Sequence, residues 1–138
     1  MTAFGVRLTK AAFYAIFVLI SLCFLTQPGR SESDLLAGLW TGGGTVTYAS
    51  GDRERARCRI HYAPRGGTRI AATATCATPS GSVSQTAVLA KTGEGRYSGR
   101  FHNEQFSVSG TIEVIVKGSS QLVRLFSSSG SALLTLSR

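Results

Sequence analysis

Two alternating runs on either side of one turn constrain this chain more than any other feature. Residues 53–63 and 68–77 alternate between polar and small or apolar side chains, and the turn sequence Pro-Arg-Gly-Gly at 64–67 separates them. This pattern is typical of a β-hairpin. Cys58 and Cys76 each lie nine residues from Gly67. A hairpin centred on Gly67 therefore places the two cysteines directly opposite each other.

The two faces of this hairpin differ, because successive side chains of a strand point to opposite sides. On the first strand one face carries Arg53, Arg55, Arg57 and Arg59, and the other carries Glu54, Ala56, Cys58 and Ile60. On the second strand Ile70, Ala72, Ala74 and Cys76 share one face, and Arg69 lies on the opposite one. We expect the cysteine face to point into a core and the arginine face to point outward.

The N-terminus has the pattern of an export signal. Arg7 and Lys10 precede Ala11–Leu25, a run of fifteen residues without a charge. This run is shorter than the roughly 20 apolar residues of a transmembrane helix, which favours a cleaved signal peptide over an uncleaved signal anchor. Either alternative places the rest of the chain beyond the membrane, in the periplasm or outside the cell, and the second tethers it there by residues 11–25.

Cysteine usage agrees with export. Of the three cysteines, Cys23 lies in the apolar run and is lost with a cleaved signal. The remaining pair, Cys58 and Cys76, predicts a disulfide worth about 3 kcal/mol in the chain-entropy model. Two cysteines make a poor zinc site, since structural zinc takes four ligands. We therefore expect a disulfide and no bound metal.

The rest of the chain predicts an all-β domain. From Asp34 onward there are twelve Lys or Arg and six Asp or Glu, a net charge of +6, and no stretch has a helical period. Seven turn signals separate eight candidate strands, at 39–49, 53–63, 68–77, 83–91, 96–101, 106–117, 121–127 and 132–137. Short connections throughout favour a small antiparallel up-and-down barrel after an N-terminal signal or anchor helix. We divide the chain into a signal or anchor (1–30), a short arm (31–37) and the barrel domain (38–138).

The expected interior mixes small and large side chains. The small residues of inward parity are Gly42, Gly44, Ala56, Ala72, Ala74, Gly99 and Gly110, and the large ones are Trp40, Tyr48, Ile70, Tyr97, Phe101 and Phe106. An eight-stranded barrel is just wide enough to be filled by side chains or to hold one small ligand. We expect close packing, with a cavity for a small apolar ligand as the alternative.

Catalytic and cofactor motifs are not found in the sequence. Neither a nucleophile elbow, a zinc-protease motif, a phosphate-binding loop nor a dinucleotide fingerprint occurs. His61 and His102 lie far apart in the chain, and an isolated histidine is most often a surface residue. Glu54 has inward parity, and we expect it at the barrel rim beside the turn at 50–52. These observations predict a protein that is not an enzyme and needs no cofactor.

The arginine face is the most suggestive functional feature. The candidate binding residues are Arg53, Arg55, Arg57, Arg59 and Arg69. Guanidinium groups on alternate strand residues form a positive row, and arginine suits bidentate recognition of phosphate and carboxylate. The alternative is an ordinary solvated outer face. Nucleic acid is disfavoured by the exported compartment and by the absence of interleaved aromatic residues on this face.

The opening of the first strand carries a family resemblance. The run Leu36-Ala37-Gly38-Leu39-Trp40 resembles the G-x-W opening of lipocalin-like and avidin-like barrels, in which the tryptophan plugs the barrel floor. It is also similar to the opening of small periplasmic inhibitors of bacterial metalloproteases. That resemblance implies an eight-stranded barrel with a Cys58–Cys76 disulfide, and an arm at 31–35 that enters the cleft of a secreted protease.

A second resemblance spans residues 38–138. The segments GLWTGGGTV, SGDRERARCR and RYSGRF look most like a group of small exported bacterial proteins of unassigned function. We therefore expect an exported, non-catalytic binding or structural module whose basic face engages an anionic component of the cell envelope. Inhibition of a secreted metalloprotease and carriage of a small apolar ligand are the alternatives, and the membrane is a partner only through an uncleaved N-terminal segment.

Overall fold

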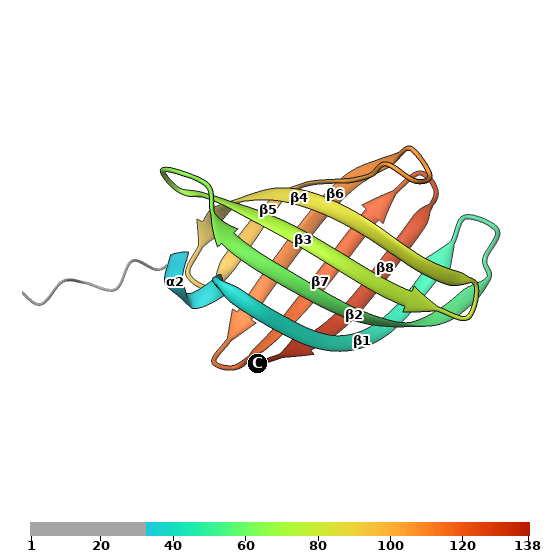
Figure 1. Ribbon diagram of the computed structural model, residues 1–138, viewed down its shortest axis with the longest axis horizontal. Helices are drawn as coiled ribbons and strands as arrows, with labels where there is room; N and C mark the ends of the chain where they lie inside the picture. The colour runs from blue at the N-terminus through green and yellow to red at the C-terminus, as the bar shows by residue number, and fades with distance from the viewer. Residues whose placement is uncertain (1–32) are drawn as a thin grey trace, which may run out of the picture. The chain divides into compact units, whose positions relative to one another are not determined.

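A computed structural model describes residues 33–138 as a closed eight-stranded β-barrel preceded by one helical turn (Figure 1). The elements are α2 (Ser33–Leu36), β1 (Gly38–Tyr48), β2 (Arg53–Pro64), β3 (Arg69–Thr78), β4 (Gly81–Gly93), β5 (Arg96–Asn103), β6 (Val108–Lys117), β7 (Ser120–Ser127) and β8 (Gly130–Ser137). The predicted signal or anchor at 1–30, with its apolar run at 11–25, lies outside the described residues. Within 33–138 no helix has the length and apolar character needed to cross a bilayer.

The topology confirms the predicted up-and-down barrel. Each strand pairs antiparallel with the next, and β8 returns to pair with β1, from Thr41 opposite Ser137 to Tyr48 opposite Gly130. Closure leaves no strand of this sheet with an unpaired edge. Every predicted strand is present, and most boundaries shift by one or two residues. The arm predicted at 31–37 is described from Ser33, where it forms the single turn of α2.

The β2–β3 hairpin has the predicted register. Cys58 lies directly opposite Cys76, and the two form a disulfide with an S–S distance of 2.04 Å. Both cysteines are buried, as are Ala56, Ile60 and Ala74 on the same inner face. The alternation of polar and apolar residues in this hairpin therefore sets the inner and outer surfaces of the barrel wall.

Glycines allow neighbouring strands of the barrel wall to approach closely. A Cβ at Gly44 would lie 1.9 Å from the carbonyl oxygen of Leu133 on β8, and one at Gly99 would lie 1.9 Å from that of Val88 on β4. No side chain fits at these separations, because real Cβ contacts do not approach 3.0 Å. These residues are required by strand packing, as well as contributing little bulk to the interior.

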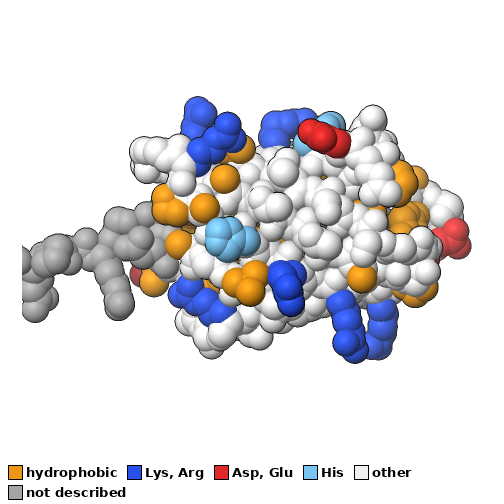
Figure 2. Space-filling model, viewed as in Figure 1, with side chains coloured by type: hydrophobic (Ala, Val, Ile, Leu, Met, Phe, Trp, Pro, Cys, Tyr) orange, Lys and Arg blue, Asp and Glu red, His pale blue; other side chains and the backbone are white. Residues whose placement is uncertain are grey.

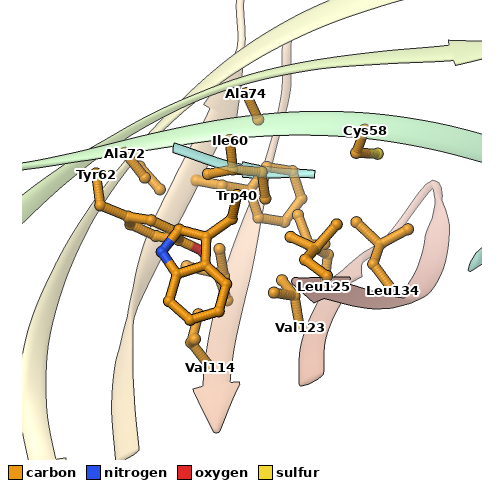
Figure 3. Packing of buried hydrophobic residues seen from close by; sticks show 14 of the residues in the cluster. Trp40, Cys58, Ile60, Tyr62, Ala72, Ala74, Val114, Val123, Leu125 and Leu134 are labelled. Carbon is orange, nitrogen blue, oxygen red and sulfur yellow. The ribbon is translucent and has the colours of Figure 1, made fainter. Parts of the chain in front are cut away.

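One end of the barrel is filled by large side chains. Trp40 is fully buried, and its indole N–H donates a 2.9 Å hydrogen bond to the carbonyl oxygen of Leu36 in α2. The guanidinium of Arg138 lies 4.5 Å from the Trp40 ring centroid and donates to the carbonyl oxygen of Ala37 at 2.9 Å. Figure 3 shows Trp40 beside Tyr62 and Val114 in this part of the core. The tryptophan closes the barrel floor as predicted.

The inward position predicted for Phe106 is wrong. β5 extends to Asn103 and β6 begins only at Val108, so Phe106 lies in the connecting turn and its side chain is 59% exposed. The Asn103 carboxamide oxygen accepts a hydrogen bond from the Phe106 backbone N–H at 3.1 Å, and Ser107 has a φ of 53°. This turn interrupts the alternation that otherwise runs from Phe106 to Val116. Tyr48, also predicted inward, lies at the rim and is partly exposed.

Candidate functional site

The predicted arginine row lies on the outer surface of the barrel. Arg53, Arg55, Arg57 and Arg59 are all exposed and alternate along β2 with buried or half-buried inner residues. Consecutive members are about 7 Å apart along the strand, because a strand rises about 3.4 Å per residue. Arg69 is also exposed, but it lies six residues from Thr75, the β3 partner of Arg59. It therefore stands about 20 Å from the row along the strand direction.

Three of these arginines line an open outer groove of about 1210 Å³, which we call the basic groove. Arg55, Arg57 and Arg59 project from β2, between two lanes of short side chains. The lining from β1 includes Thr41, Gly43 and Thr45, and the lining from β3 consists of Thr75 and Ala77. In the strand register Gly43 lies opposite Arg57, and Ala77 lies opposite it on the other side. Short neighbours leave the guanidinium groups accessible from both sides.

The outer strand faces around the basic groove carry no carboxylate. The outer-face positions of β8, β1, β2, β3 and β4 are the odd-numbered residues of 131–137, 39–47, 53–63 and 69–77 and the even-numbered residues of 82–90, and none is Asp or Glu. In Figure 2, which looks onto the face over β1 to β4, acidic side chains appear only at the edges of the view. Within residues 33–138 the row therefore has no acidic partner on its own face.

The nearest acid on β2 is held at the barrel rim, as predicted. Glu54 accepts a hydrogen bond from the Tyr48 hydroxyl at 2.9 Å and another from the Ser80 hydroxyl. The hydrogen bond from Ser80 has the largest effect in lowering the pKa of the Glu54 carboxyl, and the hydrogen bond from Tyr48 has the next largest. The hydrogen bond between Tyr48 and Glu54 raises the pKa of Tyr48. These hydrogen bonds join the β1–β2 turn to the β3–β4 turn. Glu54 therefore interacts with rim residues and not with the arginine row.

The barrel end opposite α2 carries the β1–β2 and β3–β4 turns (Figure 1). It holds an open cavity of about 830 Å³, which we call the cup. Its apolar lining includes Val46, Val83, Phe101, Leu125 and Ala132, together with both disulfide cysteines. Tyr48, Ser80 and Phe106 lie at its rim. The barrel interior is closely packed, as predicted, at the end that holds Trp40. At the other end it contains a cavity, which was the predicted alternative.

The two histidines and a buried tyrosine–glutamine pair are the other polar groups considered for a role in catalysis or metal binding. His61 and His102 do not meet; the ring Nδ1 of His102 lies 2.7 Å from the Ser109 hydroxyl on the outer face. Among residues 33–138 no three His, Cys, Asp or Glu side chains cluster in a way that could hold a metal ion. Inside the barrel, the buried Tyr62 hydroxyl donates to the Gln121 carboxamide oxygen at 3.1 Å, and burial raises the pKa of Tyr62. The sequence pattern did not indicate this pair, because Gln121 opens the predicted strand at 121–127 and the next inward residues, Val123 and Leu125, are apolar.

Comparison with known proteins places the fold but not a family. No family model and no curated protein matches the chain. A redesigned β-barrel, mFAP1, bound to DFHBI matches with a TM-score of 0.66 at 14% identity, over 79% of this chain and 100% of that one. A de novo designed fluorescence-activating β-barrel matches with a TM-score of 0.61 at 15% identity, over 79% of this chain and 98% of that one.

A third solved structure, the redesigned β-barrel b11L5F_LGL, matches with a TM-score of 0.62 at 17% identity, over 81% of this chain and 98% of its own. At these identities the likeness shows the fold alone. The chain has the architecture of a small eight-stranded, lipocalin-like barrel. Its Cys58–Cys76 disulfide is consistent with an oxidising, exported compartment.

Proposed function

We propose that this chain is an exported, non-catalytic binding module of the bacterial cell envelope, and that its basic groove engages an anionic partner. The observation that carries the proposal is the arrangement of Arg55, Arg57 and Arg59 in an open groove whose flanking lanes are short and neutral. Like charges at this spacing repel one another, and an anion that binds among them removes that cost. Arginine supplies planar, bidentate hydrogen bonds to phosphate, sulfate or carboxylate.

The test compares two charge reversals of equal size. Arg55→Glu plus Arg57→Glu changes the basic groove, and Arg96→Glu plus Arg100→Glu reverses the same number of charges at two exposed positions on the outer face of β5. Each lost guanidinium–anion contact is worth about 1.5 kcal/mol, so the first double variant is expected to lose about 100-fold in affinity for an anionic envelope fraction at low salt. The β5 variant is expected to lose far less. Equal losses in the two variants would refute a site on this face.

A second candidate function, carriage of a small apolar ligand, is favoured by the cup. Its volume of about 830 Å³ falls in the range of small-molecule sites, and its lining is largely apolar with a polar rim. Two of the structures similar in fold, the redesigned barrels mFAP1 and mFAP0, hold the small molecule DFHBI. By itself that likeness supports only the capacity of such a barrel for a ligand.

Filling the cup with a larger side chain distinguishes ligand carriage from anion binding in the basic groove. Ala132 lines the cup and Ala90 lies on the outer face of β4, so Ala132→Phe and Ala90→Phe add the same side chain inside and outside. If the cup carries a ligand, Ala132→Phe abolishes the fluorescence gain of an environment-sensitive apolar dye while Ala90→Phe retains it. No dye binding by the unaltered protein, or equal binding by both variants, would remove this candidate. Neither result affects the basic groove.

A further inference from the structure

The spacing and accessibility of the arginines point to a partner of a particular form. From Arg53 to Arg59 the row follows β2 for about 20 Å, with one guanidinium about every 7 Å. A compact anion can contact only one or two of these groups at a time. A chain that carries anionic groups along its length can contact all of them, and each further contact is then intramolecular.

The lanes beside the row have room for such a chain. Thr41, Gly43 and Thr45 form one lane on β1, and Thr75 and Ala77 form the other on β3. None of these side chains is longer than threonine, and the three threonines offer hydroxyl groups to a polar ligand. The groove is open along the strand rather than a closed pocket, which suits an extended ligand and gives no enclosure for a small one.

A flat membrane surface fits this face less well. The outer positions of β2 and β3 carry no large apolar side chain that could enter a bilayer: they are Arg, His, Ala and Thr. The exposed Leu39 lies on β1 opposite His61, past the Arg59 end of the row, and the exposed Phe126 and Leu133 lie on β7 and β8, beyond β1. A flexible chain can follow the strand and contact one arginine of the row after another.

We infer that the basic groove binds a linear polyanion, a chain with phosphate, sulfate or carboxylate groups repeated along it, laid along β2 between the two lanes. This inference rests on the proposed function and deepens it by naming the form of the partner. Arg55, Arg57 and Arg59 of the groove make the contacts with the anionic groups, and Arg53 extends the row beyond the groove. The short side chains of β1 and β3 admit the backbone of the chain.

The test uses sulfated oligosaccharides of increasing length as probes, with the monosaccharide sulfate and anionic phosphatidylglycerol vesicles as comparisons. Affinity measured by titration calorimetry is expected to rise more than tenfold from the disaccharide to fragments that span about 20 Å, and then to level off. Arg55→Gln plus Arg57→Gln is expected to remove the rise, whereas Arg96→Gln plus Arg100→Gln keeps it. The melting temperature of each variant checks folding.

The outcomes separate this inference from the function on which it rests. If the monosaccharide sulfate or the vesicles bind as tightly as the long fragments and only the β2 variant loses binding, the proposed function stands and the linear partner is wrong. If the β2 and β5 variants lose binding equally, or the unaltered protein binds none of the probes, both are wrong. An affinity that keeps rising with length without levelling off indicates non-specific attraction and also overturns the inference.

Discussion

The two halves of the outer barrel surface carry arginines in different surroundings. Over β8 and β1 to β4, the row on β2 has small neutral neighbours and no acid. Over β5 to β7, the exposed Arg124 lies opposite Glu113 in the strand register, and Phe126 is half exposed nearby on β7. The arginine-rich strand is a candidate binding site because the neighbouring strands present neither acidic nor bulky side chains beside it. The strand register decides which side chains lie beside each arginine. For identifying a binding site, it is therefore more informative here than the number of basic residues.

Among single substitutions, the largest effect is expected from moving an acid into the basic groove. Thr75 lies opposite Arg59 and Thr111 lies opposite Arg100, and both threonines are exposed on the outer face. Thr75→Glu offers an internal partner that competes with an external anion. We expect it to weaken binding of a sulfated oligosaccharide about tenfold, the effect of one lost charged contact. Thr111→Glu, measured in the same titration, is expected to change it less than twofold.

A smaller effect on stability follows from repulsion within the row. Removing one of several like charges relieves a repulsion that cross-strand pairs show to be worth about 0.2–1 kcal/mol. Arg57→Thr is therefore expected to raise the free energy of unfolding in urea by this amount at low salt, and the gain should vanish in high salt as the charges are screened. Arg100→Thr is the matched control on β5. A gain that persists in high salt would point to strand propensity instead of charge.

The smallest effect is on the pH dependence of stability and comes from Glu54 at the rim, which does not line the basic groove. The lowered pKa of Glu54 means that its ionised form is stabilised by folding, so this stability is present above the ordinary carboxyl pKa and is lost as pH falls through the folded pKa. Glu54→Gln removes that loss. Its melting temperature should fall less between pH 7 and pH 3 than that of the parent, and its anion binding should equal that of the parent.

Much of this fold could be predicted from local pattern. The equal distances of Cys58 and Cys76 from Gly67 set one hairpin register, and a single register assigns every side chain of that hairpin to a face. The short turns between the remaining runs then left a closed meander as the simplest sheet. The inward side of Trp40 followed from its parity, and its place at the barrel floor followed from the resemblance of residues 36–40 to the opening of lipocalin-like barrels.

Other features depend on three-dimensional shape that parity cannot supply. The alternation from Phe106 to Val116 continues through the β5–β6 turn, so the pattern alone does not show that the strand begins only at Val108. The cup depends on how small and large inward residues are distributed between the two barrel ends after closure. The lanes of the basic groove depend on the pairing of β1 with β2, which brings Gly43 opposite Arg57. Arg69 has the predicted parity, but its place near the hairpin turn separates it from the row.

The most direct measurement is a map of backbone amide chemical shifts during titration with a sulfated oligosaccharide long enough to span the row. Placement of the polyanion along the basic groove predicts saturable shifts in β2 from Arg53 to Arg59, in β1 from Thr41 to Thr45, and at Thr75 and Ala77 of β3, with β5 to β7 and the cup unchanged. Shifts centred on β5 to β7 or on the cup lining, or small shifts spread over every exposed arginine, would contradict it.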